Sequence, residues 1–158
     1  MNKKFVIFIC IALCVILFAT MYLHNSLTID TKCAQKFAYV LNSYNINEMD
    51  NYLDETTEII FMGQKDVYKN CRNNVISAFN EKNYAIPQYG SYGYGNNKFE
   101  NGTQKISVKL MGTFNDESIG ECVINMSIQR DGLFGYKVQS IECDDAIFGH
   151  IFFGDYIL

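Results

Sequence analysis

The side chains with the clearest potential for covalent chemistry are four cysteines: Cys33, Cys71, Cys122 and Cys143. Thiols form disulfides in oxidising compartments, pack as small apolar groups, or bind metal ions. No pair of cysteines has the CxxC or CxH spacing of a zinc site, and the chain has only two histidines. We therefore predict disulfides or free buried thiols at these positions, and no metal site.

Four cysteines allow three pairings, among which the sequence does not choose. Cys33 and Cys71 lie on the apolar stripes of two predicted helices, so two packed helices could bring them together. Cys122 and Cys143 lie on two strands joined by a turn near Asp131, which places them within one or two residues of opposite positions. Each pair is compatible with a disulfide if its Cα atoms lie about 4.4–6.8 Å apart.

Three carboxylates, Asp54, Glu55 and Glu58, are candidates for a general base. A carboxylate base must be buried for its pKa to rise toward neutrality. The position of these residues, between a short helix and a β-branched run, is more typical of a solvated turn and strand edge. The chain also lacks the GxSxG, P-loop, GxGxxG and HExxH motifs. We therefore predict no catalytic residue and no cofactor.

A tyrosine- and glycine-rich segment, PQYGSYGYGNN, carries Tyr89, Tyr92 and Tyr94. Tyrosine rings provide a large contact area at a low cost in conformational entropy, as binding surfaces do. We name these three residues as a candidate binding surface. The alternative is an edge strand whose aromatic rings cover the core.

The first element along the chain is an apolar run over residues 5–23, directly after Lys3 and Lys4. At about 1.5 Å per residue, a helix of this length spans roughly 28 Å, close to the ~30 Å hydrocarbon core of a membrane. No Lys or Arg follows until Lys32, so the positive-inside rule predicts a cytoplasmic N-terminus. We predict a single-pass signal-anchor over residues 1–24 that holds the protein in the cell membrane.

A cleaved secretory signal is the alternative, because it also combines a basic start with an apolar centre. Its apolar centre is usually about 7–15 residues long and ends at a small-x-small site. The run in this chain is longer, and no A-x-A pattern follows it. Cleavage would release a secreted protein in place of an anchored one.

The composition predicts one folded, acidic domain beyond this helix. The chain has 158 residues, of which 49 % are hydrophobic, and about 135 follow the anchor, the size of one ordinary domain. Of 13 basic and 17 acidic residues, two lysines precede the anchor, which leaves the outer domain with a net charge of −6. An acidic domain repels phosphate backbones, so we predict no nucleic-acid partner.

Hydrophobic spacing predicts helices in the first half of this domain. After a polar linker over residues 25–30, an amphipathic helix is expected from Cys33 to Tyr44, with Asp30 or Thr31 as its N-cap. A short helix follows the Asn-rich break, and a second long helix is expected over 65–82.

Strand patterns dominate the second half. After a first strand over 57–62, we expect strands over 104–114, 122–129 and 134–143, with a turn at residues 130–132. The last stretch, AIFGHIFFGDYIL, is apolar, and we expect it to form a packed final strand.

This order of elements predicts an α+β domain in which helices pack on a curved antiparallel sheet. The segment AQKFAYVLNSYNINEMDNYLDETTEIIF contains a helix, an Asn-rich break, a one-turn helix and a strand. In this order it resembles the nuclear-transport-factor-2-like superfamily, also called cystatin-like or cone-shaped. The resemblance covers most of residues 31–143. The superfamily includes isomerases, dehydratases, ligand-binding domains, immunity proteins and membrane-tethered scaffold domains, so the resemblance implies a fold and leaves the function open.

We therefore predict a membrane-anchored binding or scaffold domain over residues 31–158, extracytoplasmic and without catalytic activity. Its expected partners are the membrane, through residues 5–23, and either a protein or a small apolar ligand. A scaffold role would also imply a homo-oligomer. The resemblance implies one alternative, a small isomerase or dehydratase with a buried carboxylate in the mouth of the cone.

Overall fold

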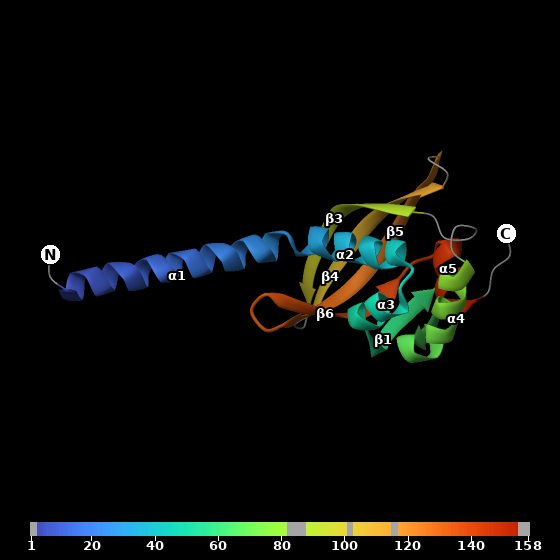
Figure 1. Ribbon diagram of the computed structural model, residues 1–158, viewed down its shortest axis with the longest axis horizontal. Coiled ribbons are helices and arrows are strands. Elements are labelled where there is room, and N and C mark those ends of the chain that lie inside the picture. The colour runs from blue at the N-terminus through green and yellow to red at the C-terminus, as the bar shows by residue number, and fades with distance from the viewer. Residues whose placement is uncertain (1–2, 82–87, 101–102, 115–116, 155–158) are drawn as a thin grey trace.

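The computed structural model describes residues 3–81, 88–100, 103–114 and 117–154, and side chains for all of these except 30, 34, 88–100, 113, 114 and 117–119. Figure 1 shows a long N-terminal helix that extends away from a domain of helices packed on a curved sheet. In chain order, the elements are α1 (Lys3–Leu27), α2 (Ile29–Ser43), α3 (Ile46–Tyr52), β1 (Leu53–Phe61), β2 (Gln64–Val67), α4 (Tyr68–Glu81), β3 (Gln88–Glu100), β4 (Thr103–Phe114), β5 (Glu117–Asp131), β6 (Gly135–Glu142) and α5 (Ala146–Phe153).

The helix α1 is long and apolar enough to cross a membrane, and none of its most apolar window is buried in the protein. Its 25 residues correspond to a length of about 38 Å. The structure therefore confirms the apolar helix predicted from the sequence. A signal sequence near the N-terminus can pass the same test of length and apolarity, so membrane insertion stays a prediction.

The segment predicted as a linker, residues 25–30, is helical except at one position. Residues 25–27 end α1, Thr28 is a turn residue, and α2 begins at Ile29. Thr28 is the N-cap of α2 and makes no side-chain cap hydrogen bond, so the predicted caps lay two or three residues too late. Asn25 is buried, and its side-chain amide donates to the Phe134 carbonyl at 3.1 Å. The polar residues that suggested a linker therefore join α1 to the domain.

The predicted amphipathic helix is confirmed as α2. Its apolar stripe is buried, with Cys33, Phe37 and Val40 fully inaccessible. Tyr44 ends α2 in the left-handed conformation, at φ 47°. Asn45 then caps α3, because its side chain accepts a hydrogen bond from the Asn47 backbone N–H at 3.0 Å.

The region after α3 differs from the prediction in its boundaries. β1 begins at Leu53, four residues early, and residues 64–67 form β2, so the helix predicted from residue 65 starts at Tyr68. Met62 and Gly63 both have positive φ and form the two-residue connection between β1 and β2. Positive φ at both central residues is what the tight hairpin turn requires.

The sheet has six strands in the order β2-β1-β6-β5-β4-β3. All neighbouring pairs are antiparallel except β1 and β6, which are parallel, so the predicted antiparallel sheet is in fact mixed. A parallel pair needs a long crossover, and the chain between β1 and β6 supplies it. The β5–β6 turn lies at residues 132–134, closed by the pair Asp131 and Gly135, slightly later than predicted.

The helices cover one face of this sheet. α2 packs against β3 and β4, and α4 packs against β1 and α5. Along the described parts of β4 and β5, buried side chains alternate with more exposed ones that are mostly polar, so the core lies between the sheet and the helices.

Residues 146–153 of the apolar C-terminal stretch form the helix α5, so the strand predicted there was wrong, and residues 155–158 lie outside the described residues. Asp145 caps it by accepting from the Ile147 backbone N–H at 2.9 Å, and Gly154 ends it at φ 70°. Phe148, Ile151 and Phe152 are buried at helical spacing. The sequence contained both end signals, an Asp N-cap and a Gly after the last turn, but the apolar run had no polar face to reveal its period.

Candidate functional site

The carboxylates named from the sequence lie on β1 and are solvated. The side chains of Asp54, Glu55 and Glu58 are 58 %, 75 % and 53 % exposed. Each lies within ion-pair distance of a lysine: Asp54 of Lys137 at 3.9 Å, Glu55 of Lys69 at 3.2 Å, and Glu58 of Lys65 at 3.6 Å. The structure therefore confirms that these carboxylates are solvated, but it places them within a strand that pairs on both sides, with β2 and β6, and not in a turn.

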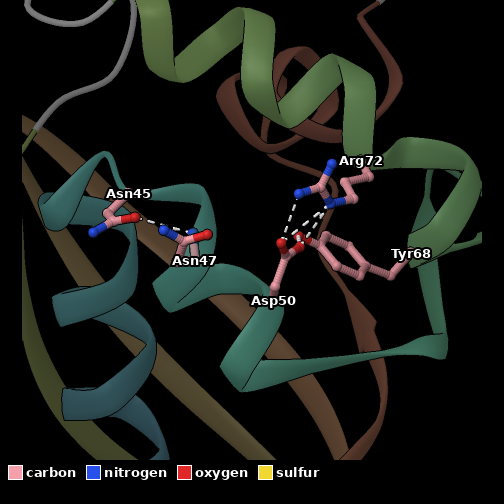
Figure 2. Close-up of polar contacts among 5 residues, drawn as sticks. All are labelled: Asn45, Asn47, Asp50, Tyr68 and Arg72. Carbon is pink, nitrogen blue, oxygen red and sulfur yellow. Dashed lines mark hydrogen bonds and ion pairs between the residues drawn. The ribbon is translucent and has the colours of Figure 1, made fainter.

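A more elaborate polar cluster lies one turn earlier, at Asp50 on α3. Figure 2 shows the Asp50 carboxylate directed toward Tyr68 and Arg72, which lie one turn apart on α4. The Arg72 guanidinium donates to both carboxylate oxygens, from Nε at 2.9 and 3.2 Å and from Nη2 at 2.7 Å. The Tyr68 hydroxyl donates to Oδ1 at 2.7 Å. A hollow of about 320 Å³ lies beside the cluster.

The electrostatics of this cluster suit a structural role, in which an ionised Asp50 joins α3 to α4. The hydrogen bonds from Arg72, and after them the one from Tyr68, lower the pKa of Asp50 against the opposing effect of burial. Burial and the neighbouring Asp50 raise the pKa of Tyr68. Asp50 therefore stays ionised with both oxygens engaged, and it is a poor acceptor for a proton near neutral pH. Sequence reasoning missed this cluster, because its only local signal is the i, i+4 spacing of Tyr68 and Arg72.

The interior between α2 and the sheet contains phenol groups and no described carboxylate. The Tyr52 ring stacks on Phe37 with centroids 5.7 Å apart, and its hydroxyl lies 3.5 Å from the Cys33 carbonyl and 3.7 Å from the Met126 sulfur. Burial raises the pKa of Tyr52 and of Tyr136, so both phenols are neutral. Among residues with described side chains, the buried polar ones are Asn25, Thr57 and Gln104. The base that a cone-fold enzyme requires is therefore not found in this part of the interior.

None of the described cysteines forms a disulfide in the structure, and two of them, Cys122 and Cys143, are in contact. Cys122 on β5 and Cys143 just after β6 place their Sγ atoms 3.2 Å apart, and both side chains are buried. The hairpin register thus brings these two cysteines together as predicted. Their sulfurs are farther apart than the ~2.05 Å of a disulfide bond. The hydrogen bond to Cys143, followed by burial, raises the pKa of Cys122.

The two helix cysteines are also buried, and neither forms a disulfide in the structure. Cys33 lies on α2 and Cys71 on α4. Burial raises the pKa of Cys71 to about 11. The disulfide considered for this pair therefore stays a prediction.

The face of the sheet opposite the helices carries a polar hollow of about 440 Å³. Its lining combines hydroxyl and amide groups with charges of both signs. The main polar residues are Glu58, Lys65, Lys105, Ser107, Asn125 and Ser127. Within it, the Ser107 hydroxyl lies 2.7 Å from the Asn125 side-chain oxygen. We call this surface the sheet-face hollow.

The structure places the tyrosine segment on β3, at the edge of the sheet. Tyr89, Tyr92 and Tyr94 pair with Gly112, Lys109 and Ser107 of β4. Their side chains lie outside the described residues, so the predicted binding surface stays a prediction. Across the described part of the chain, no group of three or more His, Cys, Asp or Glu side chains is arranged to hold a metal ion.

Comparison with known proteins identifies the fold. No protein-family model and no curated protein matches the sequence. Solved structures do match. An NTF-2 like protein of unknown function from Shewanella oneidensis is 10 % identical with a TM-score of 0.54, over 75 % of this chain and 98 % of that one. A protein of unknown function from Mycobacterium tuberculosis is 7 % identical with a TM-score of 0.54, over 77 % and 83 % of the two chains.

A third match is a variant named Rd1NTF2_05, which is 7 % identical with a TM-score of 0.52 over 75 % of this chain and 98 % of that one. Identities this low show a shared fold and carry no function. The element order, the curved mixed sheet and these neighbours agree with the resemblance drawn from the sequence. The domain beyond α1 therefore has the nuclear-transport-factor-2-like (NTF2-like) fold.

Proposed function

We propose that this chain is a single-pass membrane protein whose NTF2-like domain lies outside the cytoplasm and binds a partner without catalysing a reaction. The observation that carries the proposal is α1, an apolar helix of membrane-spanning length whose most apolar stretch has no buried residue. An apolar surface of this extent is seldom exposed to water. The two lysines before the run and the absence of Lys or Arg until Lys32 favour an outer domain.

The described carboxylates support binding over catalysis. Asp54, Glu55 and Glu58 are exposed, and Asp50 is ionised and held by Arg72 and Tyr68. An isomerase or dehydratase of this fold would need a desolvated carboxylate, and no specific observation favours that alternative.

The sheet-face hollow is the surface we assign to the partner. Its lining of carboxylates, ammonium groups and hydroxyls is too polar for a small apolar ligand, so we assign it to a protein partner with a polar surface. The helices pack on the opposite face of the sheet, so they do not block a partner that binds in the sheet-face hollow.

The topology is tested with an introduced thiol, because the four native cysteines of the domain are buried. Thr56 on β1 is exposed, so Thr56→Cys supplies a reactive group in the domain. We expect a membrane-impermeant maleimide to label this variant in intact cells and to leave the parent protein unlabelled. The protein should also stay in the membrane fraction until detergent is added. Labelling only after lysis would show that the domain lies in the cytoplasm. Release of the protein without detergent would exclude the membrane anchor.

The partner surface is tested by photo-crosslinking in cells. A benzoylphenylalanine placed at Ser127, in the hollow, should give a discrete adduct of higher mass. Ser77, exposed on α4 at the helical side of the domain, is the matched control and should give none. An adduct of twice the mass would identify a second copy of the chain as the partner. Equal labelling at both serines, or none at either, would contradict the assignment.

A further inference from the structure

The β5–β6 hairpin leaves the body of the domain and lies beside the end of α1. Figure 1 shows its orange loop extending toward the blue helix. The rings of Phe18 on α1 and Phe134 in the turn meet edge to face, with centroids 5.7 Å apart. The Asn25 side chain donates to the Phe134 carbonyl at 3.1 Å. Two contacts from α1, one apolar and one polar, therefore fix the tip of this hairpin.

The position of Phe18 sets the depth of the tip relative to the apolar run. Phe18 precedes Leu23, the last residue of that run, by five positions, which corresponds to about 7–8 Å along a helix. Phe134 therefore lies level with a residue inside the run. Leu133 and Phe134 remain 55 % and 43 % exposed, so the described part of the protein does not cover them.

Polar residues follow directly behind this apolar tip. The Arg130 guanidinium lies 4.9 Å from the centre of the Tyr22 ring, and its Nη2 donates to the Ser26 hydroxyl at 2.6 Å. Tyrosine and arginine are typical of the headgroup level of a membrane, where an apolar stem or ring meets a polar end. The order from Phe134 to Arg130 thus matches the change from acyl chains to headgroups.

We propose that the β5–β6 turn is a second membrane contact, in which Leu133 and Phe134 enter the outer leaflet beside α1 while Arg130 stays at the phosphates. The inference rests on the proposed anchor, because the depth of the turn is measured along α1. The occupant of the exposed tip is lipid, since the tip is continuous with the uncovered surface of an apolar helix. This second contact would fix the tilt of the domain and hold the sheet at a constant angle to the membrane.

The absence of tryptophan from the chain permits a direct test. The full-length variants Phe134→Trp, Val123→Trp and Leu13→Trp are each reconstituted in phosphatidylcholine vesicles with and without bromine on the acyl chains. Val123 is the matched control, because it is 47 % exposed on the same strand as Arg130 and lies about 26 Å from Asp131 along that strand. Leu13 reports on α1 itself, at a position that is 54 % exposed.

We expect brominated lipid to quench the Phe134→Trp emission by at least half as much as that of Leu13→Trp, and more strongly when bromine lies near the carbonyl end of the chains. Val123→Trp should not be quenched. If Leu13→Trp is quenched and Phe134→Trp is not, the inference fails and the anchor stands. If neither variant is quenched, both the hairpin contact and the proposed membrane anchor fail. If Phe134→Trp is shielded from a soluble quencher but not quenched by bromine, α1 alone covers the turn, and the lipid contact is excluded.

Discussion

Asp50 and Glu55 illustrate how different surroundings give carboxylates different roles. Asp50 accepts three hydrogen bonds from Arg72 and one from Tyr68, whose side chain is almost fully buried. Glu55 has one described ion pair, with Lys69, and is 75 % exposed. Water screens an exposed pair, so it contributes little to stability, whereas bidentate geometry makes Asp50 the more important of the two.

Asp50→Asn should lower the free energy of unfolding by about 1 kcal/mol at pH 7, a value reduced for solvent screening because the carboxylate is partly exposed. The pKa of Asp50 is lowered in the folded protein. Its contribution is therefore complete above the unfolded pKa of about 3.9 and is lost as the pH falls through the folded pKa. Urea unfolding of the detergent-solubilised chain should show the penalty at pH 7 and a smaller one near pH 3. Glu55→Gln is the control and should change stability by less than about 0.5 kcal/mol. An equal loss of stability in Asp50→Asn at both pH values would contradict a stabilising role of the ionised Asp50 carboxylate.

The contact between Cys122 and Cys143 predicts a selective disulfide in an oxidising compartment. Oxidised glutathione would accept two electrons and become two thiols, while Cys122 and Cys143 lose two protons and form one S–S bond. Because the pKa of Cys122 is raised, little thiolate exists at neutral pH, and the reaction should accelerate as the pH increases. The bond closes a loop of about 22 residues and should stabilise the fold by about 3 kcal/mol.

Peptide mapping checks this prediction. Trypsin cleaves after Arg130 and Lys137, which separates Cys122 from Cys143. We expect the oxidised full-length chain to give one linked pair of peptides that contains these two cysteines, and Cys143→Ser to abolish it. A predominant link through Cys33 or Cys71 would show that the sulfur contact does not decide the pairing.

At the scale of elements, the packing of α5 on β1 depends on a glycine. A Cβ atom at Gly149 would lie 2.4–2.8 Å from three atoms of the Phe61 ring. Phe61 is partly buried and packs near Phe153, with ring centroids 5.8 Å apart, so a side chain at residue 149 would have to displace its ring. Gly149 thus permits a close approach of helix and strand that a larger residue would disturb.

Gly149→Ala should therefore lower the free energy of unfolding by about 1–3 kcal/mol, as overpacking does. The same substitution in an open helix would raise it by up to about 1 kcal/mol, so the sign of the effect is diagnostic. Denaturant unfolding of the single variant and of the double variant with Phe61→Leu provides the measurement. The smaller side chain should recover part of the loss. Stabilisation by Gly149→Ala alone would show that Phe61 moves aside freely.

Element boundaries show which features local sequence determines. The buried stripe of α2 and the Asn45 cap of α3 were predictable because each depends on residues within a few positions. The strand β2 was missed because residues 64–67 are three polar residues and one valine, which show no apolar period, and only their pairing with β1 defines them. The parallel pairing of β1 with β6 joins residues about 80 positions apart, and such pairing depends on tertiary packing.

At the scale of the whole molecule, the α+β domain and the apolar helix followed from the order of patterns along the chain. The candidate sites could be predicted from the sequence only in part. Cys122 and Cys143 were predictable from hairpin register, whereas Asp50, Tyr68 and Arg72 come together through the packing of α3 on α4. The contacts of α1 with the β5–β6 turn were not predictable either, because residues 25–30 have the composition of a linker.

These contacts also bear on whether the N-terminal helix is removed. Phe18 and Tyr22 lie within the apolar helix, yet they contact Phe134 and Arg130 of the domain. Cleavage after the apolar run would remove both aromatic residues and leave Phe134 without its ring partner. We therefore predict that the protein extracted from membranes keeps residues 5–23, and intact-mass measurement should give the mass of a chain that includes them. A shorter chain in the medium, beginning after residue 23, would establish a cleaved signal, and the hairpin would then need a different partner for its apolar tip.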